Sequence, residues 1–144
     1  MDTNVTALSL PDVSSLIEKS RKLLLDDNGL FDKYPMEKIL EVYNGVGPDR
    51  FPSWFRDMLS EINSIILPAV LIHDLDYDKG GNWDDFKKAN ERLGTNAIQC
   101  VKEKYGTCSW KYWFYLAKIH IFVKLCNKYG KPGWHFTGET SETC

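Results

Sequence analysis

Apolar residues recur at intervals of three and four along most of the chain, which is the spacing of one face of an α-helix. This periodicity predicts five helices and no strands, so we expect an all-α protein. The predicted helices cover residues 11 to 26, 35 to 42, about 62 or 66 to 78, 83 to 104, and 109 to 129. The last ten residues are mostly polar and are typical of a frayed tail.

Glycines and capping residues mark the boundaries between these helices. Gly80 and Gly81 separate the third helix from the fourth. Asn82 follows them as an N-cap candidate, and Asp85 stands three residues later, as in a capping box. Residues 43 to 52, YNGVGPDRFP, hold two glycines and two prolines, so we expect a loop there.

The third and fourth predicted helices carry polar residues on apolar faces. Val70, His73, Asp74 and Tyr77 share one stripe, and Asn90 is the conspicuous amide on the apolar stripe of the next helix. Two helices joined by a Gly-Gly turn pack antiparallel, so we expect His73 and Asn90 to meet within hydrogen-bonding reach, directly or through one water. Taken alone, the pair fits a satisfied core histidine as well as a functional site.

Composition indicates a single globular domain spanning residues 1 to 144. A chain of 144 residues with 43% apolar and 26% charged residues can bury a sizeable core. The net charge of -2 gives no clear nucleic-acid signal. The amino terminus lacks a basic start followed by a long apolar stretch, which predicts a soluble protein without a signal peptide. The four cysteines lack metal spacing, and we expect reduced thiols.

Three motifs in order carry a family resemblance. They are YNGVGP at 43–48, HDLDY at 73–77 and ANERLGTNA at 89–97. Together they resemble the phospholipase A(2) superfamily, and more narrowly the short phospholipase-like proteins of bacteriophages and prophages. The match covers about residues 43–101. The first predicted helix and the aromatic last helix lie outside it.

This resemblance implies a small domain with two antiparallel core helices and calcium-dependent hydrolysis of phospholipid esters. His73 would be the general base that draws a proton from water, and Tyr77 would support the site by a hydrogen bond. Calcium would stabilise the negative charge that develops on the ester oxygen. Its implied ligands are the Asp74 carboxylate and the backbone carbonyls of Tyr43, Gly45 and Gly47.

Asn90 departs from the family pattern, which has a second carboxylate at this place. An amide cannot stabilise a protonated imidazole as a carboxylate does, so we expect slow turnover or none. Asp76 is an alternative orienting group for His73, and Asp78 is an alternative calcium ligand; otherwise both are solvated. Two classes stay open: a slow calcium-dependent phospholipid ester hydrolase, and an inactive phospholipase-like scaffold that serves as a phage-type binding or virion component. The expected location is a host cytoplasm or a virion.

The remaining histidines give weaker signals. No histidine precedes His73, so the metal-dependent phosphohydrolases that also carry a His-Asp pair would lack their first ligand here. His120 stands among apolar residues and is expected to be a satisfied core histidine. His135 belongs to the tail and carries no functional signal.

The last predicted helix combines aromatic residues with lysines. We expect one of its stripes to face the core, as in a helix buried on most sides. That stripe consists of Trp110, Trp113, Phe114, Ala117, Ile121 and Leu125, and it is widened by Leu116, Ile119, Val123 and Cys126. The alternative is contact with a phospholipid surface or another partner, where aromatic rings lie at headgroup depth and lysines meet anionic phosphates.

Overall fold

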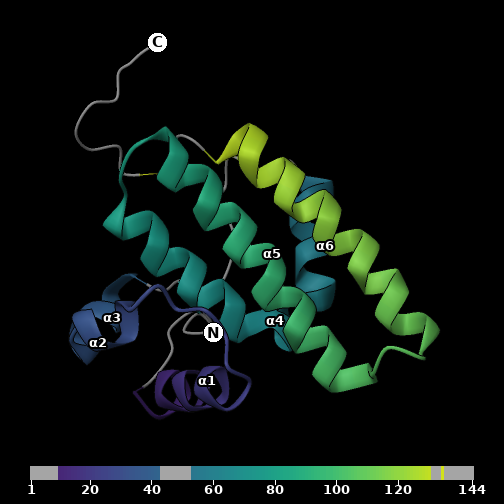
Figure 1. Ribbon diagram of the computed structural model, residues 1–144, viewed down its shortest axis with the longest axis horizontal. Helices are drawn as coiled ribbons and strands as arrows, with labels where there is room; N and C mark the ends of the chain where they lie inside the picture. The colour runs from purple at the N-terminus through teal and green to yellow at the C-terminus, as the bar shows by residue number, and fades with distance from the viewer. Residues whose placement is uncertain (1–9, 43–52, 131–133, 135–144) are drawn as a thin grey trace.

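The computed structural model describes residues 10–42, 53–130 and 134, and the regular elements in these ranges are all α-helices (Figure 1). The all-α prediction is therefore confirmed. The helices are α1 (Leu10–Lys22), α2 (Leu30–Lys33), α3 (Met36–Val42), α4 (Ser53–Lys79), α5 (Trp83–Tyr105) and α6 (Trp110–Tyr129).

The three long helices form the centre of the molecule. α4 and α5 run antiparallel from the glycine turn at 80–81, and α5 also packs along α6 (Figure 1). α1 and the short helices α2 and α3 pack against α4. Most buried apolar residues of these elements form one core, to which α5 contributes Leu93, Ala97, Cys100 and Val101, while Phe86 and Ala89 of α5 form a smaller cluster with Trp134. The predicted inward stripe of the fourth helix is thereby confirmed.

The start of α5 has the predicted capping box. The Asn82 side chain accepts a hydrogen bond from the Asp85 backbone N–H at 2.9 Å, and Asp85 Oδ2 accepts one from the Asn82 backbone N–H at 3.1 Å. These two bonds satisfy N–H groups that the first helical turn leaves without partners. The reciprocal pair fixes the point at which the chain leaves the Gly80–Gly81 turn.

Two helix boundaries differ from the prediction by more than one residue, and the short helix α2 was not predicted. α1 ends at Lys22, four residues early, because Leu24 adopts a left-handed φ of 58° that no helix accommodates. α4 begins at Ser53 and continues through Pro68, where the sequence predicted a start near 62 or 66. A proline inside a helix costs about 3 kcal/mol. Burial of the residues around Pro68 offsets that cost, since Ala69, Leu71 and Ile72 are almost fully inaccessible.

The expected core stripe of α6 is a wrong prediction. Trp110 is 70% exposed and Trp113 58% exposed, and Phe114 and Ile121 are also exposed. The side of α6 that packs inward carries Tyr112, Ile119, Phe122 and Cys126, of which Ile119 and Cys126 belong to the predicted widening of the stripe. His120 is exposed as well, contrary to the expectation of a core histidine. Apolar residues surround most of this helix, so periodicity did not define which side α5 would cover.

Candidate functional site

His73 and Asn90 meet across the α4–α5 interface, as the paired stripes predicted. His73 Nε2 lies 2.9 Å from Asn90 Oδ1, in hydrogen-bonding contact. Asn90 is completely buried and lies between Ala89 and Leu93 on the inward face of α5. The antiparallel arrangement of the two helices thus brings together two residues seventeen positions apart.

Tyr77 contributes a second donor to the same amide oxygen. Its hydroxyl donates to Asn90 Oδ1 at 2.8 Å, and its ring centroid lies 4.3 Å from that of His73. Tyr77 is one helical turn beyond His73, so both side chains leave α4 on one face. The predicted supporting role of Tyr77 therefore corresponds to a hydrogen bond with Asn90.

Asn127 of α6 completes this network and was missed from the sequence. Asn90 Nδ2 donates to Asn127 Oδ1 at 2.8 Å. Asn127 is an exposed residue of α6 that follows the buried Cys126. It belongs to none of the apolar stripes in the sequence, so periodicity gave no reason to select it. Only the packing of α6 on α5 places it beside Asn90.

The hydrogen bonds of Asn90 favour one tautomer of His73. Asn90 uses its Nδ2 hydrogens toward Asn127, so its oxygen faces His73 and Tyr77 and can only accept. His73 Nε2 must then carry the hydrogen that it donates. In the neutral imidazole the other ring nitrogen, Nδ1, holds the lone pair and is the basic atom.

Burial keeps His73 neutral. The packing around its ring lowers the pKa of His73 to about 4, and the hydrogen bond to Asn90 opposes this shift without overcoming it. An amide oxygen presents a dipole, whereas a carboxylate would present a full charge. The imidazole is therefore available as a base at neutral pH, but its protonated form is poorly stabilised.

Asp74 is half-buried and lies near α6 rather than in a cluster of acidic groups. Burial raises the pKa of the Cys126 thiol, and the negative charge of Asp74 raises it further. The other predicted calcium ligands, Tyr43, Gly45 and Gly47, lie outside the described residues. Within residues 10–42, 53–130 and 134, no group of three or more His, Cys, Asp or Glu side chains is placed to hold a metal ion.

Asp76 does not orient His73, and it is not solvated. Its side chain is only 3% exposed; Oδ2 lies 2.8 Å from Arg92 Nη1, and Oδ1 accepts from Asn28 Nδ2 at 3.0 Å. Burial raises the pKa of Asp76, while the bonds from Arg92 and Asn28 oppose the rise. Burying an acid is costly without such partners, so Asp76 belongs to a structural ion pair.

Asp78 is also engaged within the protein. It accepts a hydrogen bond from the Tyr34 hydroxyl at 2.9 Å and lies 3.9 Å from Lys38 Nζ. Burial, followed by the bond and charge of Asp78, raises the pKa of Tyr34 to about 12. Asp78 therefore joins α4 to the α2–α3 region, although its side chain remains 35% exposed to solvent.

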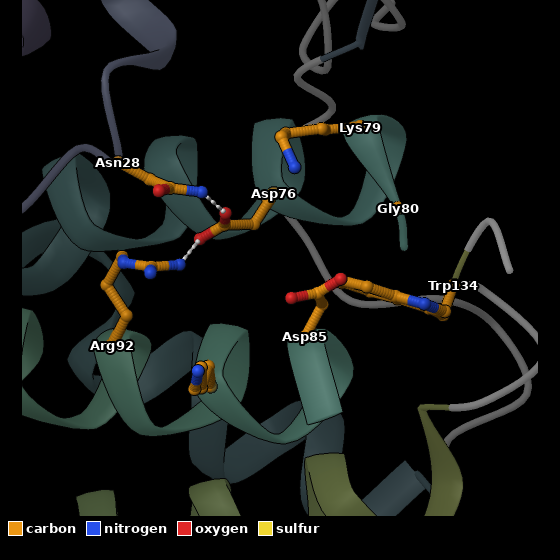
Figure 2. A pocket seen from close by; sticks show the side chains of 8 residues that line it. Asn28, Asp76, Lys79, Gly80, Asp85, Arg92 and Trp134 are labelled. Atoms are coloured by element: carbon orange, nitrogen blue, oxygen red, sulfur yellow. Dashed lines mark hydrogen bonds and ion pairs between the residues drawn. The ribbon is translucent and has the colours of Figure 1, made fainter. Parts of the chain in front are cut away.

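A polar cavity of about 260 Å³ lies beside this network, at the end of the molecule that holds the glycine turn (Figure 2). Trp134 lies between the cavity and the His73 network. Its ring packs edge-on against the Tyr77 ring, with 5.1 Å between the ring centroids, and it also lines the cavity. The lining residues are Asn28, Asp76, Lys79, Gly80, Asp85, Lys88, Arg92 and Trp134.

Comparisons with family models, with curated proteins and with solved structures give no match to this chain. None of the helices in the described ranges is both long and apolar enough to cross a bilayer.

Proposed function

We propose that this chain is a phospholipase A(2)-like protein that hydrolyses phospholipid carboxylic esters slowly, with His73 as the general base. The observation that carries the proposal is the convergence of His73 Nε2 and the Tyr77 hydroxyl on Asn90 Oδ1. These are the residues and the pairing that the motif resemblance implies. A core histidine would also accept one amide partner, and the tyrosine on the same oxygen adds the hydrogen bond that the resemblance implies.

The chemistry follows from the tautomer. His73 Nδ1 accepts a proton from water while the water oxygen attacks the ester carbonyl, and the proton then passes to the leaving alcohol. During this step the ring becomes an imidazolium that rests on an amide oxygen. Replacing a carboxylate by an amide at the equivalent place in a serine-protease triad lowers turnover about ten-thousand-fold, largely through the wrong tautomer. Here Asn90 presents its oxygen, so the tautomer is preserved and only the charge is missing.

The carboxylate oxygens of Asp74 are ligands that suit a hard cation such as calcium. The remaining proposed ligands are the backbone carbonyls of Tyr43, Gly45 and Gly47. When bound there, calcium supplies stabilisation of negative charge on the ester oxygen. Because Asp74 would be the sole charged ligand, we expect weak binding. Loss of that binding in Asp74→Ala, measured by calorimetry, is the expected result.

The alternative is an inactive phospholipase-like scaffold with a binding or virion role. One observation favours it specifically: burial holds the pKa of His73 at about 4. Among the described residues, the hydrogen-bond partner of the ring is the amide of Asn90 and not a carboxylate. A base with so low a pKa accepts a proton weakly. The hydrolase requires that His73 still accept a proton from water during the reaction, whereas the scaffold does not.

The proposed partner is an anionic phospholipid surface, which α6 would contact. Its exposed aromatic residues include Trp110, Trp113 and Phe114. Lys118 Nζ lies 4.7 Å from the Phe114 ring centroid, and the whole helix contains four lysines and no acidic residue. Aromatic rings combined with lysines suit the headgroup region of an anionic membrane.

Fatty-acid release from phospholipid vesicles tests the proposed activity, with calcium and with chelator. Asn90→Asp should raise calcium-dependent hydrolysis at least about tenfold, because the carboxylate stabilises the His73 imidazolium. Adding His73→Gln to Asn90→Asp should abolish the gain. Gln retains an N–H that can donate to residue 90 but provides no base.

A folded Asn90→Asp protein without detectable hydrolysis would favour the scaffold over the enzyme. Circular dichroism and thermal melting establish that the variant is folded. Hydrolysis that survives the His73→Gln change would show that another group is the base.

A further inference from the structure

The walls of the cavity in Figure 2 are held in place before any ligand enters. Both oxygens of Asp76 accept hydrogen bonds, from Asn28 and from Arg92. Arg92 also bonds Asp26 through Nε at 3.3 Å, so its guanidinium is held between two carboxylates. Such an arrangement fixes the planar group and lowers the entropy lost on binding.

Two basic side chains of the cavity have donor groups without a partner in the described ranges. Lys79 is the exposed last residue of α4. Its side chain makes no hydrogen bond or ion pair with any residue in the described ranges. Arg92 Nη2 likewise has no acceptor among them, since Arg92 bonds Asp26 through Nε and Asp76 through Nη1. Lys79 and Arg92 extend toward the same hollow from α4 and α5 (Figure 2).

Of the two acidic groups of the lining, only Asp76 has a cationic partner among the described residues. Asp76 is matched by Arg92, and Asp85 accepts the Asn82 backbone N–H at the start of α5. The positive end of the helix dipole reduces the effect of the Asp85 charge. Of the remaining charges, Lys88 pairs with Asp84 at 3.1 Å on the exposed surface. The lining therefore holds three basic side chains, Lys79, Lys88 and Arg92, against two acidic ones, Asp76 and Asp85, and its formal charge is positive.

We propose that this cavity binds a phosphate group of a small molecule, placed between Lys79 and Arg92. An arginine edge and a lysine ammonium supply the directed N–H donors and the charge that a tetrahedral oxyanion accepts. The volume of about 260 Å³ leaves room for a small substituent on the phosphate. Trp134 forms the wall on the side of Tyr77, so the site is distinct from the His73 network and does not rest on hydrolase activity.

Binding is tested by NMR titration of the whole chain at low ionic strength with two probes, inorganic phosphate and glycerophosphocholine. Backbone amide shifts should concentrate at residues 79–92. Lys79→Gln should weaken phosphate binding by about threefold to tenfold, the range expected for one exposed charge-assisted hydrogen bond. Lys87→Gln is the matched control, because Lys87 is an exposed lysine of α5 that does not line the cavity.

Equal weakening by Lys79→Gln and Lys87→Gln would overturn the proposal, as would shifts spread over the surface lysines or no binding of either probe. Tighter binding of glycerophosphocholine than of phosphate would identify a lipid headgroup as the source of the phosphate, and the reverse a free phosphate. His73→Gln should bind both probes like the parent, so failure of this site and failure of the proposed hydrolase are distinguishable.

Discussion

At the scale of single residues, the decisive feature is an amide where a carboxylate would stabilise charge. Asn90 Oδ1 accepts from His73 and Tyr77 together, which satisfies the buried polar atoms while His73 is neutral. Protonating His73 would add a buried charge that faces only a dipole. The pKa of about 4 for His73 expresses that cost.

This pKa predicts a loss of stability in mild acid. The folded pKa of His73 lies below the value of about 6.5 for an unfolded chain, so the unfolded state binds the proton first as pH falls. Stability should be fully present above pH 6.5 and decline toward pH 4, with a share from His73 on the order of 2–3 kcal/mol. Urea unfolding of the parent and of His73→Gln at several pH values measures that share. Identical pH dependence in the two proteins would contradict it.

At the scale of elements, the end of α6 helps to position Tyr77. Gly130 closes α6 by donating its N–H to the Cys126 carbonyl at 2.8 Å. A Cβ at Gly130 would collide with the Tyr77 hydroxyl and the Cys126 carbonyl. The absence of a side chain there allows Tyr77 to reach Asn90. α6 thus acts on the network through Asn127 and through the space at Gly130.

Gly130→Ala should therefore destabilise the fold by about 1–3 kcal/mol and displace the Tyr77 hydroxyl from Asn90. NMR signals of the His73 ring should shift with it. Gly106→Ala is the control, since Gly106 has a φ of 76° with no atom within 4 Å of the added Cβ. It should lose stability through backbone strain alone, about 1 kcal/mol, with the His73 signals unchanged.

At the scale of the whole molecule, charge and apolar exposure are unevenly distributed. The net charge is -2, yet α6 carries only basic charged residues beside its exposed aromatic rings. Such a surface opposes the overall charge of the protein and complements an anionic membrane. Contact with that membrane would keep the protein at a phospholipid surface.

Replacing Trp110 and Phe114 together with serine should lower binding to vesicles that contain anionic phospholipid by at least about tenfold, because two rings lose their contact with the interface. Both side chains are exposed, so the fold should be retained. Leu24→Ser is the control, because Leu24 is 88% exposed but lies outside α6. Sedimentation at two salt concentrations measures binding, and the parent should bind less at high salt. Equal binding by parent and double variant would contradict the role of α6.

Local sequence determined the helical class, the turn at Gly80–Gly81 and the capping box at Asn82. It also determined the meeting of His73 with Asn90, because a short turn and helical periodicity together fix which faces of α4 and α5 meet. Chemistry that depends on neighbours along the chain, or across one tight turn, could be predicted without the tertiary structure.

The tertiary structure alone decided how distant elements complete the site. Asn127 reaches Asn90 across thirty-seven positions, and Asn28 reaches Asp76 across forty-eight. The exposed side of α6 was also decided this way, since a helix that is apolar on most sides packs according to the shape of its neighbour. Periodicity reports which residues can share a face, whereas only packing determines what that face contacts.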